Sequence, residues 1–316
     1  MAQKAPGKSH RKGMTLAELF REFPDDATAE KWFAEQRWPG GPHCPYCGST
    51  NVQSGAKHKT MPYRCREKEC AKRFSVRTKT PMESSKLGFQ VWAIALYQVT
   101  TNLKGLSSMK LHRDLGITQR SAWFLAHRLR EAWKDHGAEF AGPVEVDETY
   151  IGGKRKNMSK AKRKELAGTG RGAVGKAVVV GARDRATNRV SAGMARGTDM
   201  ASLQGFIAAR AADVAKVYTD EHSGYAGMRF DHEAVNHSAG EYVRGQAHTN
   251  GIESFWATLK RAHKGTFHHF STKHLDRYVT EFSARHNVRD LDTTDQMSQL
   301  VSRMVGKRLR YQDLTA

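Results

Sequence analysis

The sequence predicts a multidomain α/β protein, with a small metal-binding module, a helical module and a larger domain built on a mixed sheet. Three observations lead to this prediction. All four cysteines lie in two close pairs within residues 43–80, apolar residues recur at helical spacing through 88–136, and strand-like segments alternate with helix-like ones through 140–290. With 316 residues, the chain is long enough to bury a large core or several small ones.

The chain is also strongly basic. It has 52 Lys and Arg against 32 Asp and Glu, a formal net charge of +20. Such an excess repels itself unless phosphates screen it, so we expect a polyanionic partner. No apolar run approaches the about 18–20 residues that span a bilayer, and four cysteines are too few for a disulfide scaffold. We therefore expect a soluble intracellular protein with no membrane partner.

Residues 1–40 are expected to form a basic tail followed by short helices. Apolar residues recur at helical spacing on both sides of Pro24, and a cluster of proline and glycine follows Trp38. This stretch is sufficiently explained as a small packing module.

Residues 41–80 are expected to form a zinc ribbon. Cys44 pairs with Cys47 and, after a loop of β-prone and turn-prone residues, Cys65 pairs with Cys70. Two such pairs typically close one tetrahedral Zn²⁺ site, and four thiolates leave no open position on the ion, so the predicted zinc is structural. The alternatives are a disulfide pair or buried thiols without a ligand.

Residues 88–136 are expected to form a helix-turn-helix DNA-binding domain. Gly116 suits a tight turn, and Thr118 is placed to cap the helix that follows. The start of that helix is where side chains of such motifs reach base edges. The alternative is a helical hairpin with a basic solvated face. The candidate DNA contacts on this helix are Gln119, Arg120, Ser121 and Arg128.

Residues 140–290 show the element order of an RNase H-like domain, with three strands, a helix, further strands and then helices. The expected strands are 144–151, 175–183, 189–195, 214–219 and 233–236, and the expected helices are 201–212, 250–262 and 272–285. Residues 291–316 are expected to form a C-terminal tail.

A basic loop is expected between the first two strands of this domain, over residues 154–171. Its eight cations and several glycines suit a DNA backbone better than a packed interior, although a solvated charge run is the alternative. The candidate contacts are Lys154, Arg155, Lys156, Lys162, Arg163 and Lys164.

Three acidic residues are candidate metal ligands. Asp147 lies in the first strand, Asp220 lies where a later strand ends, and Glu253 lies in the first turns of a helix, seven residues before Lys260. Sites that break phosphodiesters need hard oxygen ligands that hold two Mg²⁺ ions about 4 Å apart. Singly, these residues can also be a surface acid, a turn residue and the partner of Asn250 in a capping box.

Several motifs occur together along the chain, and in combination they are specific. They are Cys44-Pro-Tyr-Cys47-Gly, Leu115-Gly-Ile-Thr, Val146-Asp147-Glu-Thr-Tyr-Ile-Gly-Gly153, Thr219-Asp220 with Gly224-Tyr225, and His248-Thr-Asn250-Gly-Ile-Glu253-Ser-Phe-Trp256. With them the chain resembles the bacterial insertion-sequence transposases that join a zinc ribbon to an RNase H-like DDE catalytic domain.

The resemblance implies that Asp147 and Asp220 bind the catalytic metals. The third ligand is a Glu in some members of the family and an Asn in others, and this sequence offers both Glu253 and Asn250. We choose Glu253, because a carboxylate holds Mg²⁺ better than an amide. Lys260 then falls where the family has its basic residue.

The resemblance further implies a DNA transposase that binds terminal inverted repeats, cleaves to a 3′-OH and joins that end to target DNA. The implied cofactors are Mg²⁺ or Mn²⁺ at the catalytic site and one structural Zn²⁺. The implied partners are double-stranded DNA and further copies of the chain, at least a homodimer, in a bacterial cytoplasm near the nucleoid. Two alternatives remain open: a DNA-binding regulator with an inactive RNase H-like domain, or a metal-dependent nuclease that cuts without joining.

Overall fold

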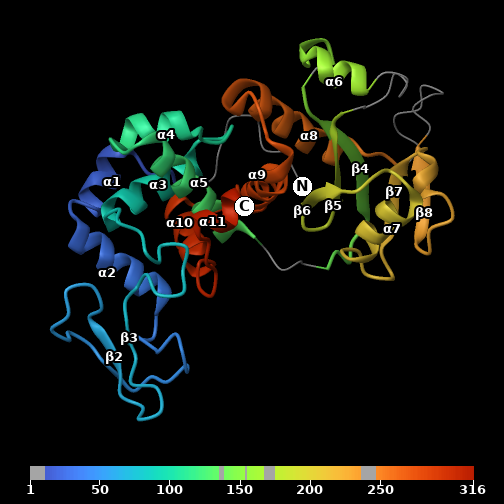
Figure 1. The fold of residues 1–316 in the computed structure, drawn as a ribbon. Coiled ribbons are helices and arrows are strands. Elements are labelled where there is room, and N and C mark those ends of the chain that lie inside the picture. Colours follow the sequence, from blue (N-terminus) through green and yellow to red (C-terminus); the bar gives the residue numbers. More distant parts are fainter. Residues whose placement is uncertain (1–10, 135–138, 154, 167–174, 236–246) are drawn as a thin grey trace. The chain divides into compact units, whose positions relative to one another are not determined.

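The computed structural model describes residues 11–134, 139–153, 155–166, 175–235 and 247–316. The chain divides into two compact units, Met1–Trp133 with Arg289–Ala316, and Lys134–Val288. Their helices and strands are drawn in Figure 1. The predicted fold class is confirmed, since a zinc ribbon, helices and a mixed five-stranded sheet are all present. Among the described residues, none of the helices combines the length and apolarity that a membrane crossing requires.

The first unit is mainly helical. Thr15 and Asp25 cap its first two helices, because their side chains accept hydrogen bonds from the backbone amides of Glu18 and Thr28. Its helices are α1 (Leu16–Glu22), α2 (Asp26–Arg37), α3 (Phe89–Thr101), α4 (Ser108–Leu115), α5 (Gln119–Trp133), α10 (Thr293–Ser302) and α11 (Tyr311–Thr315).

The cysteine module of this unit is a small antiparallel sheet. Its strands are β1 (Val52–Gln53), β2 (Tyr63–Cys65) and β3 (Arg73–Phe74), in the order β1-β2-β3. Phe74 is fully buried and stacks on Tyr63 with ring centroids 5.5 Å apart, so this aromatic pair packs across neighbouring strands.

Residues 291–316, expected as a tail, pack into the first unit. Helix α10 contacts α2, α3 and α5. Met297 and Leu300 are fully buried, and Leu314 of α11 is nearly so. The C-terminal segment therefore forms part of the core of the unit that holds the N-terminal helices.

The second unit is built on a five-stranded sheet in the order β6-β5-β4-β7-β8. The first three strands along the chain pair antiparallel, whereas β7 pairs parallel with both β4 and β8. The strands are β4 (Val144–Ile151), β5 (Ala177–Asp184), β6 (Val190–Ala195), β7 (Lys216–Asp220) and β8 (Asp231–Val235). The helical elements are η1 (Arg155–Asn157), α6 (Lys160–Glu165), α7 (Met200–Ala208), η2 (Ser223–Tyr225), α8 (Asn250–Ala262), η4 (His263–Phe267) and α9 (Thr272–Val288).

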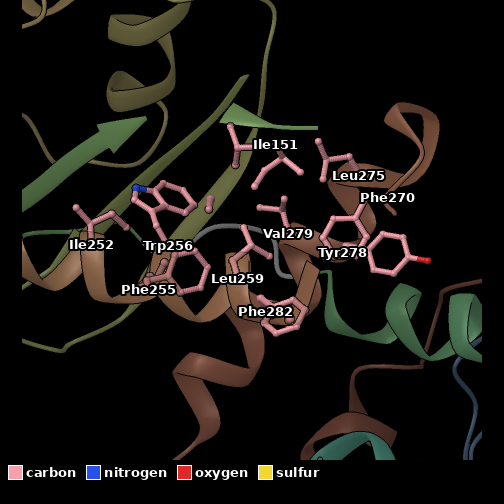
Figure 2. Close-up of a cluster of buried hydrophobic side chains, with 14 residues drawn as sticks. Ile151, Ile252, Phe255, Trp256, Leu259, Phe270, Leu275, Tyr278, Val279 and Phe282 are labelled. Carbon is pink, nitrogen blue, oxygen red and sulfur yellow. The ribbon is translucent and has the colours of Figure 1, made fainter. Parts of the chain in front are cut away.

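The two faces of this sheet carry separate apolar clusters. One cluster joins β4, β5 and β6 to α8 and α9, and Figure 2 shows Trp256 and Leu259 converging with Val279 and Ile151. The other joins the opposite face to α7 and the loops around it. Alternation along each strand divides the side chains between the faces, and Val179 belongs to the first cluster while its neighbour Val180 belongs to the second.

Part of the basic segment after β4 is helical rather than a loop. Residues Lys160–Glu165 form α6, in which the backbone amide of Arg163 donates to the carbonyl of Ser159. Lys, Arg, Ala and Glu are all good helix formers, and they outweigh the effect of the glycines on either side.

Candidate functional site

The four cysteines form a closed cluster that fits a structural zinc ion. The Sγ atoms of Cys44 and Cys70 lie 3.6 Å apart, as do those of Cys47 and Cys65, and all four lie within 4.8 Å of one another. A tetrahedral ion with Zn–S bonds of about 2.3 Å requires sulfur atoms about 3.8 Å apart. A disulfide needs about 2.0 Å, so paired disulfides do not describe this cluster.

Asp147 and Asp220 converge because their strands are parallel neighbours. The ladder between β4 and β7 pairs Val144 with Val217 and Glu145 with Tyr218. Two residues further along both strands, the same register brings Asp147 beside Asp220. Oxygens of these two carboxylates and of Glu148 lie within 4.8 Å of one another. Crowded hard oxygen donors of this kind suit Mg²⁺ or Mn²⁺.

The electrostatics of this carboxylate cluster favour a cation. Burial raises the pKa of Asp147 to about 7, and the nearby charges of Glu148, Asp220 and Glu253 add to the effect. Burial also raises the pKa of Glu148. Because these carboxyl groups resist ionising together, a divalent cation among them would relieve the repulsion.

Glu148 directly follows Asp147 on β4 and was not among the predicted metal ligands. Strand alternation directs it to the face opposite Asp147, where the hydroxyl of the buried Tyr225 donates to its Oε2 at 2.7 Å. One oxygen of Glu148 nevertheless lies within 4.8 Å of oxygens of Asp147 and Asp220, just beyond the last paired residues of β4 and β7. The sequence signals that could have identified Glu148 were its position next to Asp147 and the tyrosine, Tyr225, that follows Asp220. Strand alternation, however, predicts Asp147 and Glu148 on opposite faces of the sheet, so it does not predict that they share a site.

A buried ion network joins the start of α8 to β4. The carboxylate of Glu145 is fully buried and accepts from Arg183 Nη1 at 3.0 Å and from Arg185 Nε at 2.8 Å. Its second oxygen accepts from the backbone amide of Ile252 at 2.9 Å. Glu145 therefore fixes the helix that carries the third candidate ligand to the strand that carries Asp147. No local pattern in the sequence indicates this network, because its members come from three separate segments of the chain.

Helix α8 presents the remaining candidates of the catalytic site. Asn250 is its first residue, and Asn250, Glu253 and Lys260 are all exposed. Thr249 donates from its hydroxyl to Oε1 of Glu253 at 2.8 Å. Among the described residues, the cluster within 4.8 Å comprises Asp147, Glu148 and Asp220 and does not include Glu253, although the charge of Glu253 is felt at Asp147.

Trp256 of α8 holds Asp147 in place. Its indole Nε1 donates to Oδ2 of Asp147 at 3.0 Å, while the backbone amide of Glu148 donates to Oδ1 at 2.9 Å. The ring lies against Gly181 of β5, where an added Cβ would come within 2.7 Å of it. A glycine at this position lets the helix approach the sheet closely enough to reach Asp147.

The candidate DNA contacts on α5 differ in how far they are exposed. Gln119 and Arg120 are exposed and Ser121 is half-buried, all in the first turn after the left-handed turn at Gly116. Arg128 is 8% exposed. Its guanidinium donates to the carbonyl of Glu83 and lies over the ring of Phe124. Arg128 is therefore a packing residue of the first unit, and we remove it from the proposed DNA contacts.

The basic residues between β4 and β5 are described only in part. Lys156, Arg163 and Lys164 are exposed on η1 and α6. Lys154 lies outside the described residues, and only the backbone is described for Arg155 and Lys162.

Comparisons with known proteins match both segments of the chain that hold these clusters. Residues 139–287 match the ISXO2-like transposase domain, which spans the carboxylate cluster and α8. Residues 24–73 match the transposase zinc-ribbon domain, which spans the four cysteines. The chain is also 27% identical over 281 residues to an uncharacterised protein in the transposable element ISH50 of Halobacterium salinarum, an alignment that covers 85% of this chain and 93% of that relative.

Proposed function

Because the chain belongs to the insertion-sequence transposases that carry a zinc ribbon and an ISXO2-like transposase domain, we propose that it moves its own DNA element. In this proposal it binds the terminal inverted repeats, hydrolyses a phosphodiester at each end to free a 3′-OH, and joins that end to target DNA. The observation that carries the proposal is the convergence of Asp147, Glu148 and Asp220 just beyond the last paired residues of β4 and β7. Since two ends must be cut, we expect at least a dimer on DNA.

Both chemical steps are in-line displacements at phosphorus. In the first, water oxygen bonds to phosphorus and the 3′ oxygen leaves; in the second, that 3′ oxygen attacks a target phosphodiester and displaces its 3′ oxygen. Mg²⁺ or Mn²⁺ ions in the cluster would supply activation of the attacking oxygen and stabilisation of the leaving oxygen. There is no covalent enzyme intermediate, so the contribution of the protein is positioning and charge stabilisation.

The side chains of the site take distinct parts in this scheme. Asp147 and Asp220 would hold the ions, with Asp147 oriented by the indole N–H of Trp256. Lys260 lies two turns after Glu253 on the same exposed face of α8, where its ammonium can bind a DNA phosphate.

The third ligand remains Glu253, with Asn250 as the alternative. A comparison of Glu253→Gln with Asn250→Ala distinguishes them, because both residues are exposed and neither substitution disturbs the core. We expect strand transfer to fall by several orders of magnitude with Glu253→Gln and to change little with Asn250→Ala. The reverse result assigns the position to Asn250.

DNA contacts in this proposal come from both units. Gln119, Arg120 and Ser121 would read bases from the start of α5, and the exposed cations of η1 and α6 would hold phosphates. Removing one of these cations should reduce the number of counterions released on binding by about one, as measured by the slope of log affinity against log salt. The reduction should be the same whichever DNA sequence is used.

The test uses the DNA that naturally flanks the gene, so the end sequence need not be guessed. A selectable marker is placed inside those flanks, and its joining to a recipient plasmid is counted for wild type, Asp220→Asn and Asp231→Asn. Asp231 is the matched control, since it is an exposed acid on the neighbouring strand β8. We expect joining with wild type and the control, and none with Asp220→Asn. Cut ends that never join indicate a nuclease, and binding without cutting indicates a regulator.

A further inference from the structure

The last helix of the chain packs against the start of α5. Figure 1 shows α11 beside α5, and the side chain of Tyr311 on α11 contacts the start of α5. The guanidinium of Arg120 lies over the ring of Tyr311, 4.4 Å from its centroid. The same ring meets Phe124 edge-on at 5.4 Å and Trp123 at 6.3 Å. Tyr311 thus touches three side chains within the first turns of the proposed recognition helix.

The segment that carries Tyr311 is anchored on both sides. Before it, Lys307 Nζ donates to the carbonyl of Ala132 at 3.2 Å, and Leu309 is 4% exposed. After it, Leu314 is buried, and Asp313 pairs with Arg310 at 2.6 Å across the start of α11. These contacts hold the chain on both sides of Tyr311 and do not involve Arg120.

The N–H groups of Arg120 are available for a further partner. A ring contacts the flat face of a guanidinium, whereas its five N–H groups point outward in the plane. Arg120 is exposed, and within the described part of the chain it makes no hydrogen bond or ion pair. Its neighbours differ, because Gln119 donates to Ser108 Oγ at 3.1 Å and the Ser121 hydroxyl accepts from Thr118.

We propose that Tyr311 is a positioning residue that holds the guanidinium of Arg120 edge outward, ready to hydrogen-bond a guanine edge in the major groove. Arginine recognises guanine through two N–H groups in one plane, so a restrained plane lowers the entropy lost on binding. The C-terminal segment would in this way complete a DNA-reading surface whose other residues lie almost two hundred positions earlier in the chain. This inference rests on the proposed function, since it requires sequence-selective DNA binding.

The experiment compares binding of the full chain to a duplex from the gene's own flanks and to a random duplex of equal length. Tyr311→Leu keeps an apolar contact with Trp123 and Phe124 but removes the ring beneath the cation. We expect it to weaken binding to the flank by about 2- to 5-fold, the range for an exposed cation–π contact, with no change on the random duplex. Tyr311→Phe is the matched control and should bind as wild type does. In an Arg120→Ala background, Tyr311→Leu should have no further effect.

The outcomes separate the two proposals. If wild type does not prefer the flank over the random duplex, the proposed function fails and this inference fails with it. If wild type is selective but Tyr311→Leu costs the same with and without Arg120, or weakens both duplexes equally, only the inference is overturned. Should Tyr311→Leu not fold, Arg120→Lys gives the second route, because lysine keeps the charge without a planar edge. Full selectivity of Arg120→Lys would overturn the proposal.

Discussion

Asp147→Asn should stabilise the second unit when no divalent cation is bound. In the folded chain, burial raises the pKa of Asp147 from 3.8 to about 7, with help from the carboxylates of Glu148 and Asp220. Ionising Asp147 in the folded chain therefore costs free energy, and this cost is absent in the unfolded chain. At 1.36 kcal/mol per pH unit, a shift of about 3 units costs at most about 4 kcal/mol above pH 7.

A lost hydrogen bond offsets part of this gain. Both oxygens of Asp147 accept an N–H, one from Glu148 and one from Trp256, and an amide keeps only one acceptor oxygen. Losing one such bond costs about 1–2 kcal/mol, which leaves a net stabilisation of about 2 kcal/mol. For a unit of this size, that corresponds to a rise in melting temperature of roughly 4–8 °C.

The sign of the pH dependence follows from the raised pKa. A carboxyl group whose folded pKa is raised stabilises the fold fully below its ordinary pKa of 3.8, and that stability is lost as the pH rises through about 7. The advantage of Asp147→Asn should therefore be absent near pH 4 and reach its full size above about pH 7.

Scanning calorimetry of the full chain in a chelator, at about pH 5 and about pH 8, measures this difference. The transition of the second unit is identified as the one that Mn²⁺ raises in wild type and leaves unchanged in Asp147→Asn. Asp231→Asn, at the exposed start of β8, serves as control and should melt as wild type does. A melting temperature for Asp147→Asn at or below wild type at about pH 8, or an equal offset at both pH values, would refute the reasoning.

Three further changes test other parts of the structure. Cys65→Ser removes a buried thiol from the four-sulfur cluster, so purified protein should lose its one bound zinc by elemental analysis; retention of a full equivalent contradicts the assignment. Glu145→Gln leaves two arginines without their buried counter-charge, so it should lower the free energy of unfolding by about 3 kcal/mol, measured by chemical denaturation. The control Glu233→Gln changes a half-exposed ion pair and should lower that free energy by less than about 1 kcal/mol. Gly181→Ala places a Cβ 2.7 Å from the Trp256 ring, so it should lower the free energy of unfolding by about 1–3 kcal/mol and reduce strand transfer. At the control position Gly193 the nearest atom to an added Cβ is 3.5 Å away, so Gly193→Ala should change neither stability nor strand transfer.

Some elements were predictable because their signal is local. The helix Asn250–Ala262 has the bounds that its amphipathic pattern predicts, and so does the strand Val144–Ile151. The zinc cluster was equally accessible, because the spacing of four cysteines is itself the pattern of ligand pairs. Other features lacked such a signal. The charges of Lys160–Glu165 suggested a loop, although the same residues are good helix formers.

In the candidate site too, some residues were predictable from a local pattern and others were not. Asp147 and Asp220 were identified from their places on strands, but their convergence depends on the parallel register of β4 and β7, which pairs residues more than seventy positions apart. Glu148 joins them in the folded chain, although strand alternation predicts it on the opposite face of the sheet from Asp147. Glu145 was not among the predicted site residues. Its burial and its ion pairs with Arg183 of β5 and with Arg185 just after that strand identify it as the anchor of α8.

The sequence by itself therefore predicted a zinc ribbon ahead of a mixed α/β domain, the four cysteines that cluster, and two of the carboxylates that converge, Asp147 and Asp220. These depend on spacing and periodicity, which act between neighbours along the chain. Only the tertiary structure decided which carboxylates meet, that Arg128 is buried, and that the C-terminal segment packs on α5 with Tyr311 beneath Arg120. Such contacts form between residues distant in sequence, and they depend on the packing of whole helices and strands, which no local pattern records.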